Sequence, residues 1–314
     1  MHPTPDLSIQ MYIPVKQPTS EFVPLRDQNY HVRVWGDPKH PYKTKPLVLL
    51  HGWMDVGASF QFLVDALEEK RLIIAPDWRG FGLTHNHSEQ DHFVFADYLG
   101  DLDFLLDHYF GDQPIDLLGH SMGGNVCMLY AGVRPERIHK LINLEGFGMA
   151  STRPSQAPNR YAKWLDELKK FHQGEISLQH YEDSNAVANR LIKTNPKISI
   201  DKAQWLATHW AHAEGDGKWH ILGSSAHKLS SANLYREDET REIHKRIVAP
   251  VLCVTAEEDS LKKWWGEQYT MDEFYERMKV IANITFHKLA QTGHMLHHDQ
   301  PEALAKVIEK FLTL

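Results

Sequence analysis

The chain has 314 residues, 42% of them hydrophobic and 24% charged, which is ordinary for a globular protein of one large domain with an insertion or of two domains. The net charge of −7 comes without a basic stripe, which argues against nucleic acid as a partner. No stretch approaches the roughly 20 apolar residues that span a bilayer, and the N-terminus lacks a secretory pattern, so a cytoplasmic protein with two reduced core thiols, Cys127 and Cys253, is expected.

In chain order, the pattern predicts a hairpin and then a regular alternation of strands and helices. Residues 21–25 and 30–35 read as the two strands of an antiparallel hairpin. Apolar runs typical of strands covered on both faces follow at 47–50, 72–75, 115–118, 141–144, 251–254 and 284–287. Helical patterns lie at 59–69, 95–109, 125–131 and 302–311. The alternation predicts an α/β fold, with a mostly parallel sheet and helices on both faces.

The alternation stops between about residues 147 and 247. This stretch has helical patterns at 161–171, 177–193 and 200–212, four tryptophans and no apolar strand run. We therefore expect a core made of residues 1–146 and 248–314, and a helical cap, 147–247, inserted between two strands. Such a cap lies over the strand ends, where open α/β sheets bind their ligands.

The motif Gly119-His120-Ser121-Met122-Gly123 fits G-x-S-x-G between a predicted strand and a predicted helix. In that setting a tight turn presents the serine hydroxyl at the top of the sheet, and the helix N-terminus beneath it favours negative charge. A serine hydroxyl is a poor nucleophile until a base takes its proton. His294 lies on the loop after the last strand, where a base can reach the nucleophile, whereas His297 and His298 lie within the start of the next element.

An oxyanion hole needs two backbone N–H groups aimed at the oxygen of the tetrahedral intermediate. One is expected from Met122, the residue directly after the nucleophile. The other is expected from Trp53, in the loop after the first parallel strand.

Four motifs in this order resemble the α/β-hydrolase superfamily along nearly the whole chain, and within it the capped serine-hydrolase-like and esterase branch. They are Leu49-Leu50-His51-Gly52-Trp53, Asp77-Trp78-Arg79-Gly80-Phe81-Gly82, Gly119-His120-Ser121-Met122-Gly123-Gly124, and the segment from Gly293-His294-Met295 to Pro301-Glu302. The resemblance implies the fold, the nucleophile, the base and the oxyanion hole, and it implies no substrate. Serine hydrolysis of this kind needs no cofactor and no metal.

The position of the acid is open at this stage. In most of the family it follows the strand after the cap, and Asp259 matches that place, although Ala256 stands where the family has a turn glycine. Other members, including the haloalkane dehalogenases, use a carboxylate at the end of the strand after the nucleophile helix, and Glu145 matches that place. A carboxylate ending an apolar strand is costly unless it is hydrogen-bonded. Both residues are candidates, and the larger loss of turnover is expected from mutation of Glu145.

The sequence therefore predicts a carboxylic-ester hydrolase that acts through an acyl-enzyme on a small-molecule ester. An acyltransferase or a carbon–carbon bond hydrolase is an alternative with the same triad. A ligand-binding protein without turnover is an alternative of another class, against which the intact Ser121 and His294 argue.

Arg79 is expected to anchor loops. The cluster His85, His87, Asp91 and His92 has metal-ligand residue types, but its spacing indicates a solvated loop. Acyl chain length and oligomeric state do not follow from the sequence.

Overall fold

A computed structural model describes residues 11–86 and 90–314. Its main sheet has the strand order β1-β2-β4-β3-β6-β7-β11-β12, with the two-residue β5 (His85–Asn86) paired to β2. From β4 to β12 all neighbouring strands are parallel, whereas β1, β2 and β4 pair antiparallel. This confirms the predicted α/β fold. In sheet order the strands are Thr19–Leu25, Gln28–Trp35, Ile73–Pro76, Leu47–Leu50, Ile115–His120, Ile138–Leu144, Val251–Ala256 and Ile284–Leu289.

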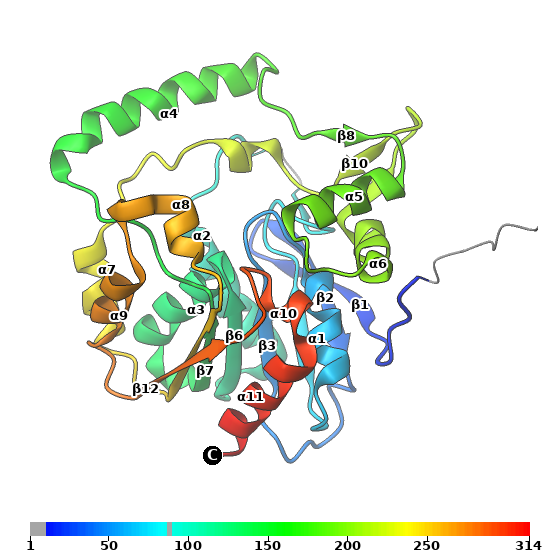
Figure 1. The fold of residues 1–314 in the computed structure, drawn as a ribbon, viewed down its shortest axis with the longest axis vertical. Coiled ribbons are helices and arrows are strands. Elements are labelled where there is room, and N and C mark those ends of the chain that lie inside the picture. Colours follow the sequence, from blue (N-terminus) through cyan, green and yellow to red (C-terminus); the bar gives the residue numbers. More distant parts are fainter. Residues whose placement is uncertain (1–10, 87–89) are drawn as a thin grey trace, which may run out of the picture.

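Helices cover both faces of the sheet, because successive side chains of each buried strand point to opposite faces. In β3, Leu47 and Leu49 pack into one apolar cluster with α1 (Gln61–Ala66) and α11 (Pro301–Thr313). Val48 and Leu50 pack into the opposite cluster, with α2 (Phe95–Phe110), α3 (Met122–Val133) and α9 (Met271–Met278) (Figure 1). Cys127 and Cys253 are buried and unpaired, as expected.

Some elements differ from the sequence prediction. The helix expected at 59–69 is a short 3₁₀ turn, η1 (Gly57–Phe60), followed by α1. The short helices α8 (Ser260–Trp265) and α10 (Leu296–Asp299) were not predicted. Across the described residues, no helix is both long and apolar enough to cross a membrane.

The insertion between β7 and β11 contains α4 (Ala157–His172), α5 (Ser184–Thr194), α6 (Ile200–Trp210) and α7 (Glu237–His244). It also forms a three-stranded antiparallel sheet that the sequence did not predict: β8 (His180–Tyr181), β10 (Trp219–Ile221) and β9 (Ala211–Ala213), in that spatial order. The helix predicted at 177–193 starts only at residue 184, where the Asp183 carboxylate accepts a hydrogen bond from the Ala186 N–H at 2.8 Å. The first part of that range forms β8 instead.

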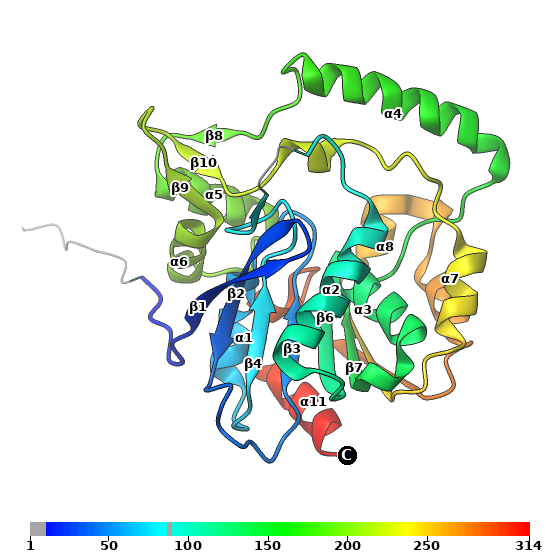
Figure 2. The same cartoon turned by 180° about the vertical axis from the view of Figure 1, so that it is seen from behind.

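The parts of this insertion lie in different places relative to the sheet. In both views α4, α5 and α6 extend across one end of the main sheet, whereas α7 lies on its flank beside α3 (Figures 1 and 2). A Cβ added to Gly132 of α3 would come within 2.2 Å of the Ile243 carbonyl oxygen of α7, so these helices are in close contact. α5 and α6 pack onto Val56, Ala58 and Phe62 of the core.

Candidate active site

The turn between β6 and α3 holds Ser121 in a strained conformation, with φ of 52° and ψ of −116°. Its N–H donates to the Leu144 carbonyl of β7 at 2.8 Å. The flanking glycines are required by close approach of the backbone. A Cβ at Gly119 would lie 2.2 Å from the Gly123 oxygen, and one at Gly123 would lie 2.1 Å from the Leu50 oxygen. This is the geometry of a nucleophile elbow, which exposes the serine at the carboxyl end of the sheet.

His294 and Glu145 contact each other at the same end of the sheet. His294 lies on the loop between β12 and α10, and its Nδ1 is 3.2 Å from Glu145 Oε2. Glu145 directly follows β7, has φ of 56° and is 2% exposed. Its carboxylate also accepts hydrogen bonds from the Ala256 N–H at 2.7 Å and from the Ser260 hydroxyl at 2.6 Å. The buried carboxylate thus has a partner on each oxygen, which offsets the cost of its burial.

Burial sets the protonation of this pair. It raises the pKa of Glu145 to about 7, while the hydrogen bonds from Ser260 and Ala256 act in the opposite direction. Burial also lowers the pKa of His294 to about 3, with a further contribution from the positive charge of Lys263. The imidazole is therefore neutral at neutral pH, as a general base must be. With its proton on Nδ1 donated to Glu145, its Nε2 has a free lone pair.

Asp259, the other candidate acid, lies elsewhere. It caps the N-terminus of α8, where its carboxylate accepts a hydrogen bond from the Lys262 N–H at 2.8 Å. Its side chain is exposed, and among the described residues it makes no hydrogen bond to His294. The loop after β11 turns directly into α8, so it brings Ser260 rather than Asp259 to the Glu145 carboxylate.

Ser121 and His294 are linked through His120, the last residue of β6 and the residue directly before Ser121. The His120 ring lies 4.7 Å from the His294 ring, between centroids, and His120 Nε2 is 2.8 Å from the His294 carbonyl oxygen. Among the described residues no hydrogen bond joins the Ser121 hydroxyl to His294. Such bonds are often long without substrate and shorten when the substrate binds.

The loop that carries Trp53 approaches Ser121 closely. A Cβ added to Gly52 would lie 3.2 Å from Ser121 Cβ. His51 fixes this loop: its Nε2 accepts the Trp78 N–H at 2.9 Å, so its Nδ1 donates to the Gly52 carbonyl at 2.7 Å. Burial lowers the pKa of His51 to about 4 and keeps the ring neutral. The other predicted oxyanion donor, Met122, is the first residue of α3.

The Asp77–Gly82 motif braces the same region. The Asp77 carboxylate accepts hydrogen bonds from the Gly57 N–H at 2.7 Å and the Leu83 N–H at 2.9 Å, and it contacts His31 Nδ1 at 2.7 Å. Arg79 is 2% exposed and binds the Asp101 carboxylate through Nε and Nη2, at 2.5 and 2.7 Å. Arg79 thus anchors the loop, as expected.

A row of four imidazoles runs from His294 into the core, and the sequence did not predict it. Its members, here called the histidine row, are His294, His120, His297 and His298, with successive ring centroids 4.7, 4.5 and 4.3 Å apart. The Ser59 hydroxyl joins the last two, 3.1 Å from His297 Nε2 and 2.5 Å from His298 Nε2. Burial lowers the pKa of every member, so the row is neutral. In the sequence, only the adjacency of His297 and His298 to the base pointed to it.

The histidine-rich segment at residues 85–92 is described only in part. His87 lies outside the described residues. Asp91 lies between two rings, with Oδ1 2.7 Å from His92 Nδ1 and Oδ2 3.0 Å from His172 Nε2 of α4. The two imidazoles bind opposite oxygens of one carboxylate, so they do not converge on one point.

The junction between β7 and the insertion is held by two side-chain amides. Asn143 accepts the Gly146 N–H at 2.9 Å and donates to the Gly146 carbonyl at 2.8 Å. Asn125 accepts the Gly148 N–H at 2.8 Å. The Tyr269 hydroxyl donates to the Phe147 carbonyl at 2.5 Å. The four residues after β7 are therefore fixed to the core.

Comparison with known proteins agrees with this geometry. A family model described as alpha/beta hydrolase fold matches residues 45–301. A serine hydrolase-like protein of Danio rerio is 24% identical over 304 residues, which cover 95% of this chain and 90% of the relative. A cis-3-alkyl-4-alkyloxetan-2-one decarboxylase of Shewanella oneidensis is 22% identical, covering 86% of this chain and 82% of its own.

A solved structure, the thioesterase domain from the curacin biosynthetic pathway, matches with a TM-score of 0.79 and 23% identity, covering 93% of this chain and 99% of its own. The family model and the relatives support a hydrolase. With a match across most of its length, the chain belongs to the α/β hydrolase fold family.

Proposed function

We propose that this protein is a serine hydrolase that cleaves carboxylic esters of small molecules through an acyl-enzyme intermediate. The observation that carries the proposal is the 3.2 Å contact between His294 Nδ1 and Glu145 Oε2 beside the strained Ser121 turn. A φ near 50° is costly for any residue with a Cβ, so a purely structural turn here would favour glycine. The presence of serine therefore points to a function of its side chain.

The mechanism follows from these positions. Ser121 Oγ attacks the acyl carbon while His294 Nε2 takes its proton, which forms a bond between Oγ and the acyl carbon and a tetrahedral oxyanion. The N–H groups of Trp53 and Met122 stabilise that oxyanion. The oxyanion then collapses and breaks the bond to the alcohol, which leaves with the proton from His294, and the acyl group stays on Ser121 Oγ as an ester. Water, deprotonated by the same nitrogen, attacks the acyl-enzyme and releases the acid. Glu145 holds the imidazole in one tautomer and stabilises its positive charge, and Asp259 serves as a helix cap.

We further propose that residues 149–236 act as a lid and that α7 belongs to the core. Contacts between the lid and the Gly80–Gly82 loop support this: Ser224 N–H donates to the Gly80 carbonyl at 2.8 Å, and Gly82 N–H donates to the Leu222 carbonyl at 2.9 Å. Trp205 is buried against Phe62, with ring centroids 5.6 Å apart, so it forms lid core rather than a substrate pocket. The buried unpaired cysteines fit a reducing compartment, and we propose a cytoplasmic location.

The same residues also suit an acyltransferase or a carbon–carbon bond hydrolase, in which a different acceptor or acyl fragment uses the same acyl-enzyme. A binding protein without turnover is the rival of another class. The neutral, oriented His294 argues against it, because a receptor has no use for a general base.

The test uses Ser121→Ala with wild type. Wild type should release nitrophenol from p-nitrophenyl acyl esters and react covalently with a fluorophosphonate at Ser121. The variant should keep its circular dichroism spectrum, lose labelling and lose at least ~10³-fold in rate. Labelling that persists at another serine would refute the nucleophile assignment. Labelling of Ser121 without release of nitrophenol from any ester would refute ester hydrolysis while keeping the nucleophile.

A further inference from the structure

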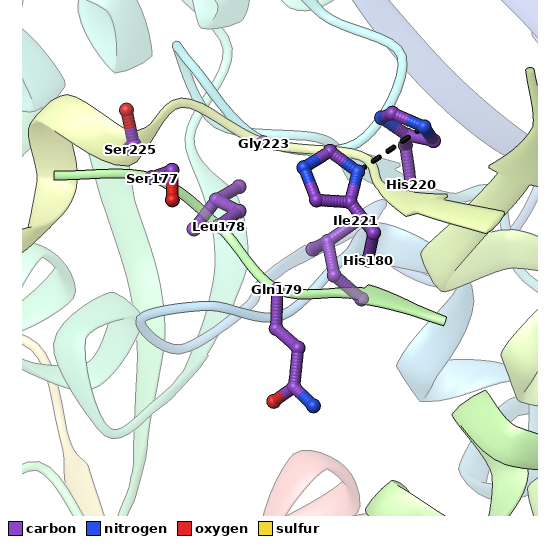
Figure 3. Close-up of a pocket in the computed structure, with 8 residues that line it drawn as sticks. All are labelled: Ser177, Leu178, Gln179, His180, His220, Ile221, Gly223 and Ser225. Carbon is purple, nitrogen blue, oxygen red and sulfur yellow. Dashed lines mark hydrogen bonds between the residues drawn. The ribbon is translucent and has the colours of Figure 1, made fainter. Parts of the chain in front are cut away.

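We propose that the lid carries a binding site for one divalent transition-metal ion, best fitted by Zn²⁺, with His180, Asp216 and His220 as ligands. These residues come from β8, from the turn between β9 and β10, and from β10. Their ligand atoms all lie within 4.8 Å of one another. Figure 3 shows His180 and His220 with their rings turned toward each other beside the pocket they line.

The three side chains converge on one nitrogen. His220 Nε2 is 3.1 Å from His180 Nδ1 and 3.0 Å from Asp216 Oδ2. A neutral imidazole nitrogen carries one hydrogen at most, so it cannot donate fully to both neighbours. A cation at the centre of the three atoms would accept a lone pair from each.

The separations match a metal shell. Metal–ligand distances of about 2.0–2.2 Å in tetrahedral geometry put neighbouring ligand atoms about 3.3–3.6 Å apart. The two observed separations to His220 Nε2, 3.0 and 3.1 Å, need only a small opening, and the third pair, His180 and Asp216, lies within 4.8 Å. Two imidazoles and one carboxylate favour zinc, copper or nickel over magnesium and calcium, which prefer all-oxygen shells.

The backbone positions these ligands before any ion binds. His180 and His220 are directly opposite partners in the antiparallel pairing of β8 and β10, so their side chains lie on one face of the sheet. Asp216 Oδ1 accepts the Lys218 N–H at 2.9 Å, which leaves Oδ2 to face His220. His212, opposite His220 on the other side, is already bonded to Glu214 at 2.6 Å and stays outside the set.

Three protein ligands leave the fourth coordination position of a tetrahedral ion open. The site borders a pocket of about 260 Å³, whose lining includes Leu178, Ile221 and Gly223, so water has access to the ion. β8 is held to the β9–β10 hairpin by its strand pairing with β10, and no direct loop connects them. An ion bound by all three ligands would add a second link between β8 and the hairpin. We therefore expect bound Zn²⁺ to protect the segment from 177 to 221 against proteolysis.

The experiment titrates Zn²⁺ into the full chain, freed of metal by chelator, with calorimetry for stoichiometry and Co²⁺ absorption for geometry. Wild type should bind one ion per chain with the spectrum of a tetrahedral site. Loss of an outer partner typically weakens metal sites by about 10–100-fold, so His180→Ala and His220→Ala, each removing a ligand, should each weaken binding at least ~100-fold. Circular dichroism confirms folding, and the measurement does not depend on hydrolase activity.

The matched control is His172→Ala. His172 is also a lid histidine 3.0 Å from an aspartate oxygen, and with His92 it forms a second His–Asp–His arrangement, but one that does not converge. This variant should bind Zn²⁺ as wild type does. Failure of wild type to bind, or equal binding by His220→Ala and wild type, would overturn the proposal. The second result would place the ion elsewhere, for example at the buried group Asp55, His297 and His298.

Discussion

Replacing Glu145 by glutamine tests whether its carboxylate is the acid that orients His294, because the change replaces one oxygen by an NH₂ group. In the native protein Oε1 accepts the Ala256 N–H and Oε2 accepts the Ser260 hydroxyl while facing His294 Nδ1. The amide oxygen must stay with the Ala256 N–H, because that group can only donate. The amide NH₂ then faces Ser260, whose hydroxyl can rotate and accept, and also faces His294 Nδ1.

The expected loss of turnover in Glu145→Gln follows from a change in the tautomer of His294. An N–H facing Nδ1 makes that nitrogen an acceptor and moves the imidazole proton to Nε2, the atom that must take the proton of Ser121. In another serine enzyme the equivalent change of acid to amide lowers turnover about 10⁴-fold. We expect a loss of ~10²- to 10⁴-fold here, which is about 2.7 to 5.4 kcal/mol of transition-state stabilisation.

The assay measures hydrolysis of p-nitrophenyl esters together with the rate of fluorophosphonate labelling, with circular dichroism to confirm folding. The control is Asp259→Asn, since asparagine caps a helix as well as aspartate does and preserves the start of α8. It should lose less than ~10-fold. A large loss in Asp259→Asn, with Glu145→Gln near wild type, would refute the reasoning and assign the acid to Asp259.

Three further outcomes are expected. Because burial raises the pKa of Glu145 to about 7, its pair with His294 takes up a proton as the pH falls through that value, so the labelling rate should drop below about pH 7; the same acid limb in Glu145→Gln would contradict this origin. Gly123→Ala, whose Cβ would lie 2.1 Å from the Leu50 oxygen, should destabilise the fold by about 3 kcal/mol in urea titrations. Gly174→Ala, with φ of 76° and no atom within 4 Å of the new Cβ, should cost only about 1 kcal/mol, and equal losses would count against the close-approach argument. Replacing residues 149–236 by a flexible Gly/Ser linker should change acyl-chain preference, and an unchanged preference would remove the lid from specificity.

Much of the fold was predictable because buried parallel strands leave unbroken apolar runs. The runs at residues 47–50 and 251–254, which form β3 and most of β11, stand out for this reason. The lid sheet was missed because its strands have two or three residues and are half exposed, so neither run length nor alternation marks them. The helix expected from residue 177 starts at residue 184 because Asp183 provides its N-cap, and hydrophobic periodicity alone does not indicate where a cap lies.

The candidate site could be proposed from the sequence as far as its backbone motifs go. Ser121 follows from the spacing of Gly119 and Gly123, since a Cβ at either position would lie within 2.2 Å of a backbone oxygen, and the loop of Trp53 follows from the resemblance to the α/β-hydrolase motif. The sequence alone could not decide whether Glu145 or Asp259 lies beside His294, because both residues follow strands at the same edge of the sheet. What separates them is the direction of the chain after β11, which enters α8 at once and uses Asp259 as its cap. The contacts of His51 and His120 likewise depend on segments distant in sequence.

The anchored junction after β7 has a mechanical consequence for any opening of the lid. Glu145 lies only two residues before Phe147, so a lid that pivoted at the end of the strand would drag the carboxylate away from His294. Asn143, Asn125 and Tyr269 hold that stretch through Gly148. Arg277 of α9 extends this anchoring, because its guanidinium donates to the Met149 carbonyl at 2.7 Å and to the Ser151 hydroxyl at 2.8 Å, so the proposed lid can turn only beyond Ser151. A lid that turned beyond that point would leave the contact between Glu145 and His294 in place, so entry of a substrate would not disturb the alignment of the two side chains.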